Sequence, residues 1–153
     1  MKKLNFSTLF ALQFLLIGVV IGIFISMKAT SEDYRFFYIY SGTSGFITAW
    51  LTSYFLIERP NKPTDARFVL TTVIVGLLSH WLCWYLIDIE LNIRYYLLNE
   101  YFYEPPMNLL TSLYGAFAFC LWSWMFFGWA TGLGAALTLY STKVIKRRTI
   151  KLV

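Results

Sequence analysis

Charge is what this sequence lacks most. Only 14% of its 153 residues are Asp, Glu, Lys or Arg, whereas about a quarter is usual for a soluble domain. Hydrophobic residues reach 58%, and no charged residue occurs between Leu109 and Tyr140. Because so few charges cannot cover a globular surface, the composition predicts an integral membrane protein.

The groups that most catalytic sites use are also scarce. The chain has one histidine, His80, and two cysteines, Cys83 and Cys120. No Cys-x-x-Cys pair, cluster of His, Asp and Glu, Ser/His/Asp set or phosphate-binding loop can be read from it. The two cysteines lie in different apolar runs, so we expect no disulfide between them. We therefore expect a protein that is not an enzyme and that carries no cofactor and no metal.

Four apolar runs are each long enough to cross a hydrocarbon core of about 30 Å as a helix. They cover residues 4–27, 36–57, 68–87 and 109–131. The first run is interpreted as a retained span, because it is too long for a signal peptide and Met27-Lys28-Ala29 is a poor cleavage site. The predicted fold class is an all-α, four-transmembrane-helix bundle that forms a single membrane domain.

The fourth apolar run is longer than a helix needs to be to cross the membrane once. From Leu109 to Tyr140 it would measure about 48 Å as a helix. Two interpretations stay open. Either the helix leaves the membrane near Trp129 and extends to about residue 140 with an apolar face that needs a partner, or the span is tilted or kinked at glycine. A basic tail, residues 141–153, follows in both cases.

The distribution of Lys and Arg predicts the orientation. With both termini inside, ten basic residues lie on the cytoplasmic side and three outside, as expected for a bacterial inner membrane protein. Topology thus explains most of the net charge of +5. We expect the basic residues of the inner loop and the tail to contact anionic lipid or a cytoplasmic protein, and not nucleic acid. They are Arg59, Lys62, Arg67, Lys143, Lys146, Arg147, Arg148 and Lys151.

The outer connector, residues 88–108, is rich in Tyr, Phe and Leu between acidic residues. Amphipathic aromatic residues favour the headgroup level of a bilayer, so the connector predicts a short interfacial helix that ends before Pro105. An outward-facing receptor surface is the alternative.

Small and weakly polar residues gather on one face of every predicted span, which favours close helix packing. In the first and fourth spans they form the GxxxG pattern. This pattern predicts a tight bundle and self-association, and it leaves open whether the faces pack within one chain or between chains. The principal residues are Gly18, Gly22, Ser41, Gly45, Ala49, Gly128, Gly132 and Ala136.

Two polar side chains are expected inside the membrane. Gln13 lies on the opposite side of its helix from Gly18 and Gly22, where it can bond a second neighbour. His80 is an intramembrane ionisable group and so a candidate functional residue. It is either a neutral imidazole bonded to Ser79 or to a hydroxyl of a facing helix, or a proton, ligand or metal site.

In span number and approximate topology, the whole chain resembles the small four-helix membrane subunits of bacterial anti-phage defence systems, such as the membrane component of Kiwa. This resemblance implies a membrane sensor coupled to a cytosolic effector. The sequence thus favours an oligomeric sensor or anchor for a cytoplasmic partner. A small oligomeric channel, holin-like pore or transporter subunit is the alternative, although Gln13 cannot carry a proton cycle.

Overall fold

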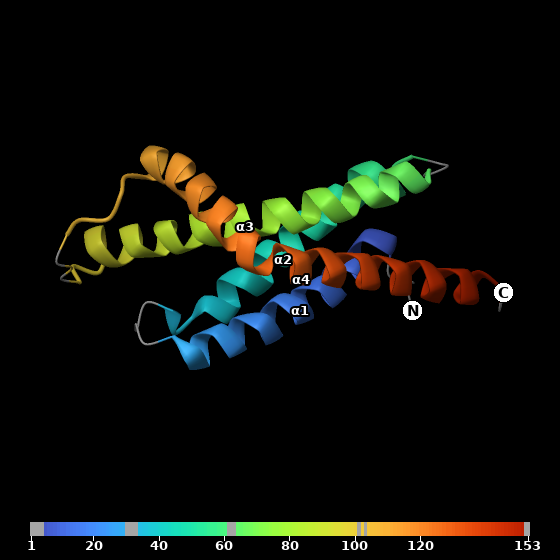
Figure 1. Ribbon diagram of the computed structural model, residues 1–153, viewed down its shortest axis with the longest axis horizontal. Coiled ribbons are helices and arrows are strands. Elements are labelled where there is room, and N and C mark those ends of the chain that lie inside the picture. Colours follow the sequence, from blue (N-terminus) through green and yellow to red (C-terminus); the bar gives the residue numbers. More distant parts are fainter. Residues whose placement is uncertain (1–4, 30–33, 61–63, 101, 103, 152–153) are drawn as a thin grey trace.

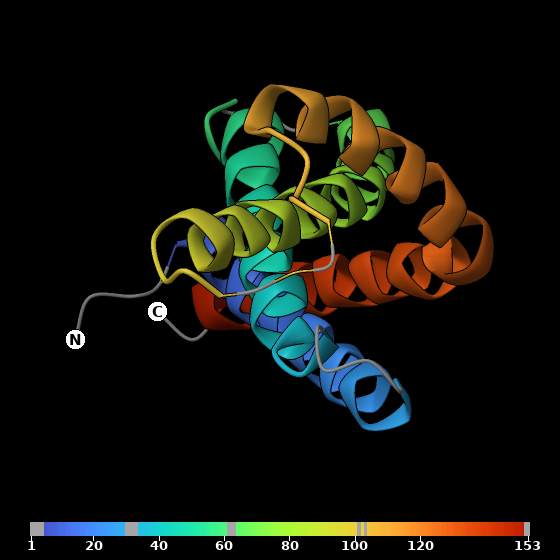
Figure 2. The ribbon, with the colours of Figure 1, turned by 90° about the vertical axis from the view of Figure 1, so that its left-hand side faces the viewer.

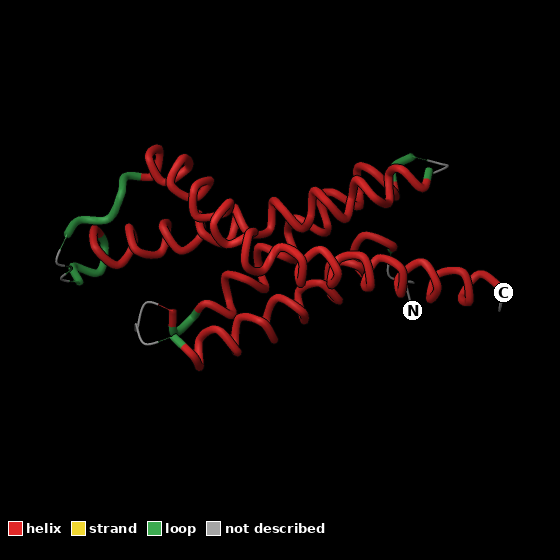
Figure 3. The backbone as a smooth tube through the Cα atoms, in the orientation of Figure 1, coloured by secondary structure: helices red, strands yellow, loops and turns green. Residues whose placement is uncertain are grey.

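The computed structural model describes residues 5–29, 34–60, 64–100, 102 and 104–151, and all regular structure within these ranges is helical (Figure 3). The predicted all-α fold is confirmed. The elements are α1 (Phe6–Lys28), α2 (Phe37–Ser53), the π-helical turn η2 (Tyr54–Glu58), α3 (Asp65–Tyr96) and α4 (Leu109–Lys151).

Helix α1 begins where its first amides find acceptors. The Asn5 side chain accepts a hydrogen bond from the Thr8 amide at 2.9 Å, as an N-cap does. The Glu58 carboxylate, at the end of η2, accepts the Ser7 amide at 3.0 Å. A negative charge at a helix N-terminus is favourable, so this contact ties the start of α1 to the end of η2.

The helices form two antiparallel hairpins, α1–α2 and α3–α4, which pack closely at one end of the molecule and diverge at the other (Figure 1). The closely packed end contains the start of α1, the end of η2, the start of α3 and the end of α4. The hydrophobic core lies towards this end, and it receives Phe10 from α1, Ala49 from α2, Val75 from α3 and Ala135 from α4.

Within the part of the chain that the structure describes, three helices are long and apolar enough to cross a membrane: Phe6–Lys28, Asp65–Tyr96 and, within α4, Leu109–Lys146. Helix α2 has 17 residues, but η2 continues it without a break to Glu58. In η2 the Arg59 amide bonds to the Tyr54 carbonyl at 2.8 Å, five residues back. The predicted span 36–57 thus corresponds to α2 together with η2.

Helix α3 continues through the first part of the expected outer connector. It runs to Tyr96, so the helix expected near the interface is an extension of α3. Arg94 pairs with Glu90 one turn earlier, at 3.5 Å, and with Glu100 beyond the helix end, at 2.6 Å. The chain then turns through Asn99, whose φ of 53° is left-handed.

Helix α4 is curved, and it bends around α3 (Figure 2). The Asn108 side chain caps its start by accepting the Thr111 amide at 2.9 Å. The sequence left open whether residues 131–140 form a cytoplasmic extension or part of a kinked span. In the structure this segment packs inside the bundle. Ala135 and Leu139 join the core, and Thr138 and the neighbouring Thr142 are buried. Whether this segment lies inside or outside the membrane stays a prediction.

Candidate functional site: a cavity beside His80

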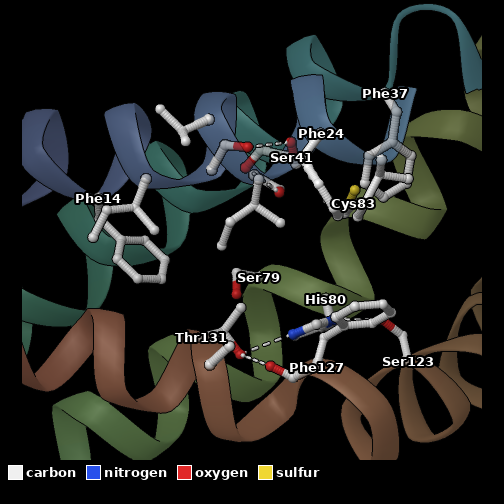
Figure 4. Close-up of a pocket in the computed structure, with 17 residues that line it drawn as sticks. Phe14, Phe24, Phe37, Ser41, Ser79, His80, Cys83, Ser123, Phe127 and Thr131 are labelled. Carbon is white, nitrogen blue, oxygen red and sulfur yellow. Dashed lines mark hydrogen bonds between the residues drawn. The ribbon is translucent and has the colours of Figure 1, made fainter. Parts of the chain in front are cut away.

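His80 connects α3 to two points on α4. Its Nδ1 lies 2.7 Å from the Ser123 hydroxyl oxygen, and its Nε2 lies 2.9 Å from the Thr131 hydroxyl oxygen (Figure 4). Of the expected partners, the structure therefore has hydroxyls from the facing helix and not that of Ser79.

This double contact fits the curvature of α4. Ser123 and Thr131 are eight residues apart, which is about 12 Å along a straight helix. Both hydroxyls nevertheless reach the nitrogens of one five-membered ring. The imidazole therefore lies on the inner side of the bend. It joins the two arms of α4, which are the segments before and after Gly128.

Gly128 lies between these arms and allows the tight local packing. The Trp124 ring covers it so closely that a Cβ at position 128 would lie 2.5 Å from the indole Cδ1. Gly128 is thus covered by the Trp124 side chain of its own helix, and pairing of its GxxxG face with another helix stays a prediction.

The hydrogen bonds are all satisfied by a neutral imidazole. Thr131 Oγ1 lies 3.1 Å from the Gly128 carbonyl oxygen, to which it can donate. The same hydroxyl can then accept from Nε2–H, and Nδ1 can accept from the Ser123 hydroxyl. His80 therefore needs no charge to hold the bend.

A cavity of about 410 Å³ lies between the two hairpins, next to His80. In Figure 4, side chains of α1 and α2 form one wall and most of those of α3 and α4 the other, whereas Cys83 of α3 lies beside Phe24 and Phe37. Most of the lining is apolar, and it includes Ile21, Phe24, Phe37, Phe127 and Ala130. Its volume falls within the range of about 300–1,000 Å³ that is usual for ligand pockets.

Three hydroxyl groups of the cavity wall bond to the backbone. Ser41 donates to the Gly18 carbonyl at 2.7 Å, and Ser44 donates to the Ser41 carbonyl at 3.1 Å. Ser79 donates to the Gly76 carbonyl at 3.4 Å. The polar residues that line the cavity therefore offer a guest little unsatisfied hydrogen-bonding capacity.

The small residues of α1 and α2 lie at the interface between these two helices. A Cβ at Gly18 would meet the Ser41 backbone, and one at Gly22 would meet Tyr38 and the Ser41 hydroxyl. Gly45 lies against Phe14, and Ala49 is fully buried in the core.

The small residues of α4 do not form one continuous contact face. Gly132 approaches Gly76 of α3, with 3.8 Å between its Cα and a Cβ built at Gly76. A Cβ at Gly132 itself would have no neighbour within 4 Å, and Ala136 is exposed. Self-association through this helix stays a prediction.

Gln13 connects α1 to α4. Its Oε1 accepts a hydrogen bond from the Ser141 hydroxyl at 2.5 Å and lies 3.4 Å from the Thr142 hydroxyl. The sequence anticipated a second neighbour for Gln13 but could not identify it, since these residues lie 128 and 129 positions away.

The predicted basic residues that the structure describes lie at the closely packed end. Lys143 stands 3.7 Å from the Asp65 carboxylate and 4.4 Å from the centre of the Phe68 ring. Arg59 is exposed, and Arg67 and Lys146 are partly exposed. Lys62 lies outside the described residues. Arg147, Arg148 and Lys151 belong to helix α4 by their backbone.

Among the described residues, no group of three or more His, Cys, Asp or Glu side chains could hold a metal ion. Cys83 and Cys120 are both free and buried. Comparison of the chain with protein-family models, curated proteins and solved structures finds no match.

Proposed function

We propose that this protein is a non-enzymatic integral membrane protein that senses a state of the bilayer and anchors a cytoplasmic partner. In this proposal α1, α2 with η2, α3 and α4 are the four spans, and both termini are cytoplasmic. One observation carries it: the start of α1, the end of η2, the start of α3 and the basic end of α4 gather at the same end of the bundle (Figure 1).

The end of α4 suits a docking element. The helix continues to Lys151, beyond the core contact of Leu139 and the buried Thr142. Lys143 rests on Phe68 and beside Asp65, which orients the base of this segment. A cationic helix at the inner surface can bind anionic lipid at about 1 kcal/mol per basic residue, or an acidic protein surface.

The proposed orientation is tested with a green fluorescent protein fused to the C-terminus, which fluoresces only when it stays in the cytoplasm. A bright fusion supports a cytoplasmic α4 end. Loss of fluorescence with normal expression in the membrane would refute the proposed topology.

Partner binding is tested by purification of the full chain in a mild detergent, followed by identification of co-purifying proteins. A variant with Gln at Lys146, Arg147, Arg148 and Lys151 should lose a soluble partner. The matched control carries Gln at Lys28 and Arg35 on the other side of the membrane and should retain it. Retention by both variants would exclude the α4 end as the docking element.

Two further parts of the proposal need separate measurements. Cross-linking in membranes should trap a defined homo-oligomer, as the small-residue faces predict. The anti-phage role that the resemblance implies predicts fewer plaques when the protein and its partner are expressed together. Ion conductance in vesicles that contain the purified chain alone would instead favour a pore.

A further inference from the structure

We propose that the cavity between the two hairpins binds one hydrocarbon chain, either the acyl chain of a lipid or an isoprenoid chain. The inference rests on the membrane location proposed above, and it names the class of ligand that the proposed sensor would bind. It does not depend on the docking of a partner at the α4 end.

The lining of the cavity selects an apolar guest. Ser41 and Ser79 bond to backbone carbonyls, and His80 is engaged at both ring nitrogens. A buried water needs two to four polar partners, and apolar cavities stay dry. Since the wall offers little free hydrogen-bonding capacity and many aliphatic and aromatic groups, a hydrocarbon chain fits it better than water or a polar metabolite does.

The cavity is also placed where such chains are abundant. The residues that line it come from the central and outer parts of the proposed spans, such as Phe24 on α1, Phe37 on α2 and Phe127 on α4. Phe24 is 64% exposed and lies at the border of the cavity. A chain can therefore enter sideways from the bilayer between the diverging hairpins.

The cavity lies where a bound chain would contact the bend of α4. His80, Ser123 and Thr131 all line it, so the contacts that hold the bend form part of its wall. A chain that fills this space contacts both arms of α4 and stabilises the separation of the hairpins. Occupancy would thereby affect the helix that ends in the basic segment.

The test uses the full chain in lipid nanodiscs with two photoreactive probes, a mid-chain diazirine fatty acid and a diazirine farnesyl analogue. Mass spectrometry then maps the labelled residues. We expect saturable labelling on both hairpins, for example at Ile21 and Ala130, that an excess of the unlabelled chain prevents. The probe that labels at the lower concentration identifies the source of the chain.

Two alanines of α4 provide a matched pair of variants. Ala130 lines the cavity, whereas Ala118 is exposed and does not. Ala130→Phe should lower labelling about tenfold, which corresponds to about 1.4 kcal/mol, and Ala118→Phe should leave it unchanged. Ser79→Leu, which fills the cavity from α3, replaces Ala130→Phe if the latter does not fold.

Two outcomes would overturn the proposal. One is equal labelling of a folded cavity-filling variant and the unchanged protein. The other is non-saturable labelling concentrated on exposed residues such as Trp122 and Trp129. Either outcome would show ordinary contact with bilayer lipid, and partner capture by the α4 end would remain independently measurable.

Discussion

Replacement of Gly18 by alanine tests the contact between α1 and α2 directly. A Cβ at this position would lie 2.5 Å from the Ser41 carbonyl oxygen and 2.9 Å from its carbonyl carbon. Both are backbone atoms, so no side-chain rotation can remove the clash. The two helices must separate by about 1 Å to restore ordinary contact.

The expected effect follows from three contributions. Overpacking costs about 1–3 kcal/mol, and separation weakens the interhelical hydrogen bond from the Ser41 hydroxyl to the Gly18 carbonyl, worth about 0.6–1.7 kcal/mol. Alanine regains about 1 kcal/mol through its higher helix propensity. We therefore expect Gly18→Ala to lower the free energy of unfolding by about 1–4 kcal/mol.

The assay is reversible unfolding of the purified protein in mixed micelles, followed by tryptophan fluorescence. Gly132→Ala is the control, because its Cβ would meet nothing within 4 Å. It should leave stability unchanged or raise it by up to about 1 kcal/mol. Equal stability of the two variants would refute the proposed approach of α1 and α2. A destabilised Gly132→Ala would instead indicate that another chain covers this position.

Three further substitutions test the polar contacts in the same assay. His80→Phe should cost about 1–3 kcal/mol, because it removes both bonds to α4; an unchanged stability would contradict their role in holding the bend. Gln13→Leu and Ser141→Ala should each cost about 0.6–2 kcal/mol, and the double variant should cost less than the sum, since the two share one bond; full additivity would exclude that bond. Glu58→Ala should cost about 0.5–1 kcal/mol by removing the carboxylate at the start of α1; an unchanged stability would contradict that role.

The helical content could be predicted from the sequence because apolar runs of span length have few other solutions. The extension of α3 was missed, since its polar residues suggested an interfacial connector. A local signal was present: Glu90 and Arg94 are four residues apart, a spacing that supports a helix. The same spacing separates Asp88 and Asn92, whose side-chain amide bonds to the Asp88 carbonyl at 2.8 Å.

The site could be predicted only in part. The sequence identified His80 as the intramembrane ionisable residue, but its partners lie 43 and 51 positions away. Their pairing depends on the path of α4, which depends in turn on packing against α1 and α3. Hydroxyl residues on both sides of Gly128 in the charge-free run 109–140 were the available signal, and this signal alone does not give the direction of the bend.

The bend of α4 lies between two regions of the helix that pack against different neighbours. Near the closely packed end, Ala135 and Leu139 must reach a core shared with α1 and α2. Farther along, Ser123 and Cys120 follow α3, with the Cys120 thiol 3.5 Å from the Leu77 carbonyl oxygen. Since the hairpins diverge between these two regions, space opens beside His80, where the arms meet. The cavity is therefore a consequence of how the bundle packs, and a change that straightens α4 should reduce it.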